Sequence, residues 1–280
     1  MTSRSRPPQS RPGRSGAALA LRGRSGLPWL TIVAVLVILG LVVAVFTYIY
    51  SKQRARSAAA AAEAAAAEVL KPWQPSPTNM DPSIAIPGIY VGQTVNDGTT
   101  ITFPNYRAAL HVTSAQRVAY DRFPPVGGPH DAEWAACNGV VYPSAVRDEN
   151  MVHTLEHGAV WIAYNPATLA PGDLDTLKAL VVGKTYLSLS PYPTLDQPIA
   201  LQAWGHQLKL SSAADPRVRQ FITALQANRY ITPEPNGSCD QPDFLTRLPP
   251  FDPAPRGSDA IPLSGAGLVG ATAEMGAPGR

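Results

Sequence analysis

Histidines supply the strongest chemical signal in the sequence, above all His153 and His157, which lie four positions apart. We expect a short helix over residues 148–157 that ends at Gly158, and positions i and i+4 of a helix share one face. Two imidazoles on one face can bind the same Zn, Cu, Ni or Fe ion, and a nearby carboxylate such as Glu156 can orient a ring or join the ligands. This segment is therefore a candidate metal site.

The same segment also fits the pattern H-x-x-E-H, in which two histidines bind zinc and the glutamate activates a water molecule for peptide hydrolysis. That chemistry requires a longer helix and a downstream acidic ligand. Here Gly158 ends the helix at once, and Glu234 qualifies as the acidic ligand only by its distance along the chain. A zinc hydrolase with Glu156 as general base therefore stays an alternative, and we assign no other catalytic residue.

A further histidine, His130, follows a stretch of two glycines among three prolines at residues 123–129. This composition predicts a stiff turn rather than a phosphate-binding loop, which needs a following helix and usually a lysine. The turn would hold His130 in a fixed place, either as a metal ligand or as a cap for a backbone group.

Cys137 and Cys239 are the two cysteines of the chain. In an oxidising compartment such a pair most simply forms a disulfide. Two free thiols and thiolate metal ligation remain as alternatives, although the wide spacing lacks the C-x-x-C feature of common zinc sites.

The elements that must position these residues follow a long apolar segment. Residues 30–50 contain no charge over 21 positions, enough for a helix to cross the ~30 Å core of a bilayer. The segment exceeds the ~7–15 residues of a signal-peptide core, and basic residues follow it in place of a small-residue cleavage site, so we expect an uncleaved membrane helix. Six arginines precede the helix and three basic residues follow it closely, which predicts a cytoplasmic N-terminus and an extracytoplasmic C-terminal part.

The charge and composition of the chain exclude some classes of function and of fold. Residues 1–71 hold 10 Lys/Arg and 2 acidic residues, a net charge of +8, whereas residues 72–280 hold 13 and 18, a net charge of −5. An acidic domain offers no case for binding DNA or RNA, because phosphate binding needs clustered Lys and Arg. The 29 prolines and 22 glycines among 280 residues also exclude a chain that is one compact domain throughout.

We expect five parts along the chain. An Ala-rich run without Pro or Gly predicts a helical stalk, either a spacer or a pairing helix, and clustered prolines then end it. The parts are a disordered basic cytoplasmic tail (1–29), the membrane helix (30–50), the stalk with a Pro-rich linker (51–83), a domain (84–240) and a disordered tail (241–280).

The domain alternates short β-branched runs with helical segments, which predicts an α+β fold. We expect strands at 99–103, 159–164, 185–189, 199–204 and 206–210. Helices should begin near Asp173 and after the N-cap Asp215, besides the one at 148–157. Trp134, Trp161 and Trp204 should lie in the core, with an aromatic ligand-binding surface as the alternative.

Several ordered motifs carry a resemblance to a known family. They are P-P-V-G-G-P-H-x-x-x-W at 124–134, H-x-x-E-H-G-A-V-W-I-x-Y at 153–164, S-P-Y-P at 190–193, A-W-G at 203–205 and T-P-E-P-x-x-x-C at 232–239. Together they resemble an uncharacterised bacterial family of membrane-anchored or exported domains of unknown function. The resemblance implies a single extracytoplasmic domain and marks His111, His130, His153, Glu156 and His157 as motif positions, but it brings no reaction. It gives no role to His206.

These observations together predict a transition-metal site formed by His111, His130, His153, His157 and Glu156, with Zn or Cu as the ion and Met151 as a soft ligand if the ion is Cu⁺. The chain would then handle a metal at the cell surface or use it to stabilise the domain. An alternative from another class is a non-enzymatic module that docks on an envelope or membrane protein. In that module the histidines would form hydrogen bonds with Glu156 and Asp131.

Overall fold

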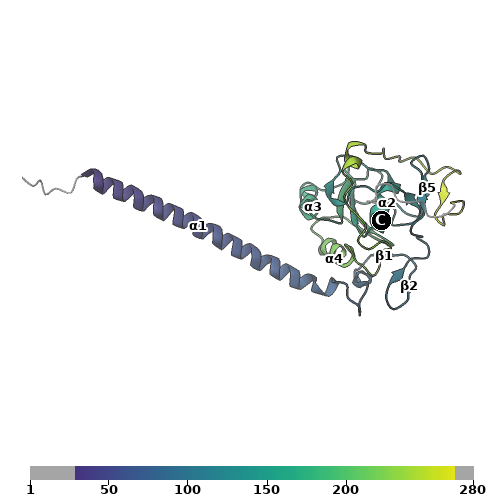
Figure 1. Cartoon of the computed structure of the whole chain (residues 1–280), viewed down its shortest axis with the longest axis horizontal. Coiled ribbons are helices and arrows are strands. Elements are labelled where there is room, and N and C mark those ends of the chain that lie inside the picture. Colours follow the sequence, from purple (N-terminus) through teal and green to yellow (C-terminus); the bar gives the residue numbers. More distant parts are fainter. Residues whose placement is uncertain (1–28, 269–280) are drawn as a thin grey trace, which may run out of the picture. The chain divides into compact units, whose positions relative to one another are not determined.

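The computed structural model describes residues 29–268 (Figure 1). The tail expected at residues 1–29 lies outside this range apart from Trp29. By their contacts, residues 1–63 and residues 64–280 form two compact units.

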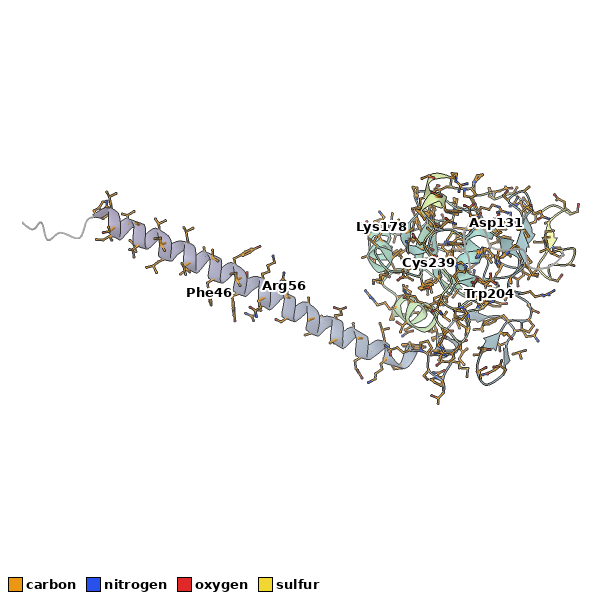
Figure 2. All side chains as sticks on the ribbon, viewed as in Figure 1. Phe46, Arg56, Asp131, Lys178, Trp204 and Cys239 are labelled. Carbon is orange, nitrogen blue, oxygen red and sulfur yellow. A yellow bond between two sulfur atoms is a disulfide. The ribbon has the colours of Figure 1, made fainter. Side chains whose placement is uncertain are left out.

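Helix α1 (Trp29–Leu70) contains the apolar segment and continues without a break through the Ala-rich run. Its residues 29–69 are exposed, and Figure 2 shows Phe46 and Arg56 projecting from its surface. Within the described residues, this helix alone is long and apolar enough to cross a membrane. A membrane span and a signal sequence both satisfy that criterion.

The second unit is built on a six-stranded mixed sheet. Its strands, in the order in which they pair, are β1 (Tyr90–Val91), β11 (His206–Leu210), β10 (Ile199–Ala203), β8 (Val160–Tyr164), β9 (Leu187–Pro191) and β7 (Asn138–Val141). The pairs β1–β11, β11–β10 and β10–β8 are antiparallel, and the pairs β8–β9 and β9–β7 are parallel. The predicted mixture of helix and sheet is therefore confirmed.

Three helices pack on this sheet. They are α2 (Asp148–Glu156), α3 (Asp173–Val181) and α4 (Pro216–Leu225). The predicted capping signals act as expected: the Asp215 carboxylate accepts from the Arg217 N–H, and Gly158 takes a positive φ of 96° directly after α2. Helix α2 contacts both the central strand β8 and a separate short ribbon described next.

Three two-stranded ribbons complete the described fold. Strand β4 (His111–Val112) pairs in parallel with β6 (His130–Asp131), β2 (Val95–Asn96) pairs with β3 (Ile101–Thr102), and β5 (Val118–Ala119) pairs in parallel with β12 (Ile261–Pro262). The predicted strand at 99–103 is thus reduced to two residues. The ribbon β4–β6 is the one that packs against α2.

The expected boundaries of the domain need correction at both ends. Before β1, the segment contains the short helices η1 (Lys71–Trp73) and η2 (Pro82–Ala85), and Asp81 is buried beside His206, with a distance of 2.9 Å from its Oδ2 to Nε2. After residue 240, η3 (Pro242–Thr246) and β12 show that the chain keeps regular structure, so the predicted disordered tail is wrong for these segments. Residues 269–280 lie outside the described range.

The core of this unit is formed by one large cluster of buried apolar side chains. Trp134, Trp161 and Trp204 are each at most 2% exposed, as expected for core residues. The indole N–H of Trp161 donates to Ser190 Oγ at 2.8 Å, which satisfies its polar edge inside the sheet.

Candidate metal centre

Two short strands and one helix bring the candidate ligands together. The parallel register of β4 and β6 sets His111 directly opposite His130. Helix α2 supplies His153 and Glu156, which share a face at i and i+3. The four side chains therefore come from three segments whose backbones are fixed by hydrogen bonding.

The four residues form a compact, buried group. One potential ligand atom from each of His111, His130, His153 and Glu156 lies within 4.8 Å of every other. Their residues are 7%, 0%, 0% and 2% exposed, respectively. The ring centroids of the three histidines are 4.7 to 5.2 Å apart. Such a group can hold a metal ion.

Backbone carbonyls orient two of the histidine rings. His130 Nδ1 lies 2.8 Å from the carbonyl oxygen of Gly128, and His153 Nδ1 lies 2.6 Å from that of Asp131. A carbonyl oxygen only accepts hydrogen bonds, so Nδ1 carries a proton in both rings and Nε2 is the nitrogen through which either ring could bind an ion. Metal-binding histidines almost always donate their other ring N–H to a carbonyl, a carboxylate or water in this way.

Glu156 is held by a backbone donor and by His130. The N–H of Ala109 donates to Oε1 at 2.6 Å, and Oε2 lies 2.7 Å from His130 Nε2. Burial alone would raise the pKa of Glu156, but the charge and hydrogen bond of His130 and the Ala109 N–H lower it to about 2. Glu156 is thus a carboxylate at neutral pH and can neutralise a cation in this group.

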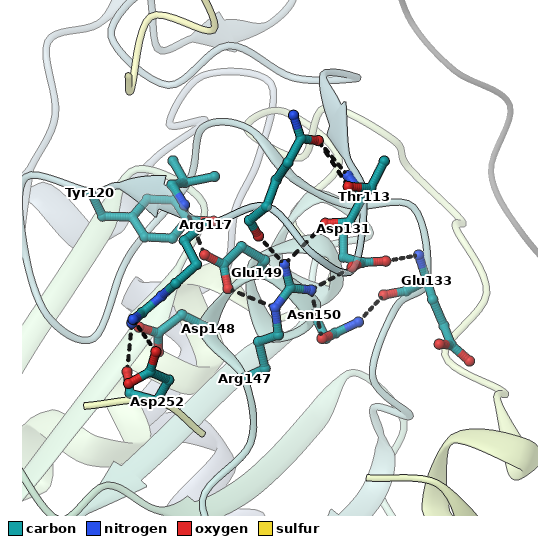
Figure 3. A network of polar contacts seen from close by, with 12 residues as sticks. Thr113, Arg117, Tyr120, Asp131, Glu133, Arg147, Asp148, Glu149, Asn150 and Asp252 are labelled. Carbon is teal, nitrogen blue, oxygen red and sulfur yellow. Dashed lines mark hydrogen bonds and ion pairs between the residues drawn. The ribbon is translucent and has the colours of Figure 1, made fainter. Parts of the chain in front are cut away.

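A network of polar contacts surrounds Asp131, the residue that follows His130 (Figure 3). The Arg147 guanidinium forms an ion pair with the Asp131 carboxylate, and its Nε lies 3.2 Å from Glu149 Oε2. Glu149 Oε1 in turn accepts from the Val118 N–H at 2.9 Å. Because the backbone oxygen of Asp131 orients His153, the network fixes a neighbour of the candidate ligands.

His157 lies beside the group of four rather than within it. Its ring is 4.6 Å from that of His153, as the i, i+4 spacing predicted. Its Nδ1, however, lies 2.7 Å from the Ser238 carbonyl oxygen, and its Nε2 is 3.6 Å from Glu234 Oε2. The sequence predicted one shared site, and the structure gives His157 its own set of neighbours.

The two cysteines, Met151 and the Glu156 carboxylate are further candidate functional groups in the sequence. Cys137 and Cys239 form a disulfide, as expected. Met151 is buried in the hydrophobic core and 0% exposed. Glu156 is the general base of the hydrolase alternative. Its buried carboxylate accepts a hydrogen bond from the Ala109 N–H and contacts the His130 ring.

Sequence reasoning missed the partners that orient the site. The N–H of Ala109, the carbonyl of Gly128 and the Arg147–Asp131 ion pair carry no motif of their own. The one usable signal was Gly127-Gly128 before His130, since both glycines take positive φ values of 154° and 104°. These conformations turn the chain into β6.

Comparison with known families supports the predicted resemblance in its general form. Residues 111–241 match a family described as Protein of unknown function (DUF3105). A DUF3105 domain therefore spans these residues, and it includes the four clustered residues and both cysteines. Searches of curated proteins and of solved structures give no match.

Proposed function

We propose that this chain is a single-pass membrane protein whose domain binds one transition-metal ion through His111, His130, His153 and Glu156. The observation that carries the proposal is the burial of four potential ligand atoms within 4.8 Å of one another. Three imidazoles and one carboxylate suit Zn²⁺ or Cu²⁺. The ion would add a strong cross-link between β4, β6 and α2.

The dimensions are close to those of a tetrahedral zinc site. Zinc–nitrogen and zinc–oxygen bonds of about 2.0–2.2 Å place neighbouring ligand atoms about 3.3 Å apart. The present spread of up to 4.8 Å would have to contract towards that value when an ion binds. The 2.7 Å pair of His130 and Glu156 would separate slightly as the ion enters between them.

Burial and ligand number favour a structural or metal-handling role over hydrolysis. A catalytic zinc keeps one coordination position open for water and substrate, whereas a structural zinc has four protein ligands. Each of the four residues is at most 7% exposed, which keeps a polypeptide substrate away. The alternative of a zinc hydrolase is therefore less well supported.

A second candidate is a non-enzymatic envelope module in which the cluster is an ion-paired part of the core. The direct contact of 2.7 Å between His130 Nε2 and Glu156 Oε2 favours this candidate, because it stabilises the group without an ion. In that case replacing a histidine would lower stability and leave metal content unchanged.

The proposal places the N-terminus in the cytoplasm and the domain outside. The charge difference across the apolar segment supports this orientation, and the disulfide supports an oxidising compartment for the domain. The membrane is then the first partner of the chain. An envelope protein that contacts the domain is the other partner we propose.

Metal content tests the proposal directly. We expect the full-length chain, purified in detergent without a polyhistidine tag, to retain about one Zn or Cu ion per chain by elemental analysis. His153→Gln should lose the metal, whereas His206→Gln, a buried histidine paired with Asp81, should keep it. A folded wild-type chain that stays metal-free after incubation with both ions would contradict the proposal.

A further inference from the structure

A cavity of about 350 Å³ lies at the C-terminal end of α2. Among its lining residues are His157, Tyr186, Arg229 and Asn236. His157 is 1% exposed, so its ring forms the inner wall of this cavity. The cavity therefore reaches a side chain that contacts the buried centre.

His157 connects the cavity with the proposed metal centre. Its ring centroid is 4.6 Å from that of His153, which belongs to the group of four. The Ser238 carbonyl oxygen accepts a hydrogen bond from Nδ1–H of His157, so Nε2 is the ring nitrogen through which His157 could bind an ion. That nitrogen is 3.6 Å from Glu234 Oε2, and the Glu234 side chain is 33% exposed. The partly exposed Glu234 carboxylate thus contacts the buried His157 ring, which in turn contacts His153 of the centre.

The loop that carries Glu234 is fixed onto the end of α2. The Glu234 N–H donates to the Glu156 carbonyl at 3.1 Å. A Cβ atom at Gly237 would lie 2.5 Å from the His157 ring, so only glycine lets the loop pack this closely. The disulfide of Cys239 with Cys137 ties the loop to the domain. The His157–Glu234 pair is therefore a built feature and not a chance encounter of surface side chains.

A buried centre requires a path by which a hydrated ion can lose its water in steps. We propose that His157, which borders the cavity, and Glu234 form a transfer site that binds the incoming divalent ion between their side chains and passes it to His153 and the centre. Arg229 lines the cavity, and the Glu234 carboxylate supplies a negative charge next to His157. This inference rests on the proposed function.

The transfer site predicts changes in rate rather than in equilibrium. We would follow binding of Co²⁺ to the metal-free, full-length chain by stopped-flow visible absorption, and release of the ion to excess chelator in the same way. His157→Gln and Glu234→Gln should each slow uptake and release by similar factors, ~10-fold or more. One ion per chain should still bind, with unchanged affinity.

Two comparisons make the result specific. Glu133→Gln removes the same charge from a side chain that is 21% exposed and pairs with Arg247, so it should leave both rates unchanged. Glu234→Gln, at a partly exposed position, keeps the test valid if His157→Gln fails to fold.

The outcomes separate the two proposals. If the wild-type chain binds Co²⁺ and both variants bind and release it at wild-type rates, the transfer site is wrong and the centre stands. If His157→Gln instead weakens the equilibrium affinity with normal uptake, His157 is a permanent ligand and the transfer site is again wrong. A folded wild-type chain that binds no ion contradicts the centre, and the transfer site with it.

Discussion

At the scale of single residues, protonation of Glu156 should couple stability to acidity. Its pKa in the folded, metal-free domain is about 2, below the ordinary value of 4.5. A carboxyl group whose pKa is lower in the folded than in the unfolded chain stabilises the fold when the pH is above the unfolded-state pKa. This stabilisation is lost as the pH falls to the folded-state pKa. The stabilisation by Glu156 should therefore be lost between pH 4.5 and about pH 2.

This shift gives a measurable difference between variants. Across that window, acid should reduce the free energy of unfolding of the metal-free chain by on the order of 3 kcal/mol through this group. Glu156→Gln should lose that part of the pH dependence in denaturant titrations, whereas Glu133→Gln should retain it. Equal pH dependence of wild type and Glu156→Gln would show that His130 does not stabilise the Glu156 carboxylate.

At the scale of elements, the disulfide should hold the loop over α2. The bridge joins positions 102 residues apart, and closing so long a loop stabilises a fold mainly by restricting the unfolded chain. It also positions Ser238, whose carbonyl orients His157.

Reduction should therefore destabilise the domain. We expect dithiothreitol to lower the free energy of unfolding by ~2–5 kcal/mol, measured by denaturant titration with and without reductant. The double variant Cys137→Ala/Cys239→Ala should start at the lower value and show no response to the reductant. An unchanged midpoint for the reduced wild type would mean that packing alone holds the loop.

Some elements could be predicted from the sequence because their signals are local. Strand β11 runs over the expected residues 206–210, and α4 begins directly after its predicted cap Asp215. Helix α2 is within one residue of the expected range, and the prediction that His153 and His157 share its face agrees with the 4.6 Å between their ring centroids. Capping and periodicity act within a few residues, so one sequence is enough to find them.

The rest depends on contacts that the sequence order does not reveal. Strands β4 and β6 have two residues each, too few for alternation, so the register that sets His111 opposite His130 had no signal. Strand β12 pairs with β5 more than 140 positions away, and the predicted tail therefore missed it. His157 was grouped with His153 by spacing, but the distant Ser238 and Glu234 determine its neighbours.

At the scale of the whole molecule, the apolar part of α1 should anchor the chain with its domain outside. We expect protease added to spheroplasts of a bacterial expression host to digest the domain while leaving a short N-terminal fragment. Mass spectrometry of the intact chain should show the uncleaved N-terminal region, in contrast to a processed signal sequence. A domain that resists protease until the membrane is permeabilised would reverse the orientation.

The central claim is a closed site of three imidazoles and one carboxylate. X-ray absorption spectroscopy of the zinc-loaded, full-length chain tests it most directly. We predict four nitrogen or oxygen ligands at about 2.0–2.2 Å with the outer-shell scattering of three imidazoles. A spectrum with fewer than three imidazoles, or a chain that retains no zinc after desalting, would contradict the account.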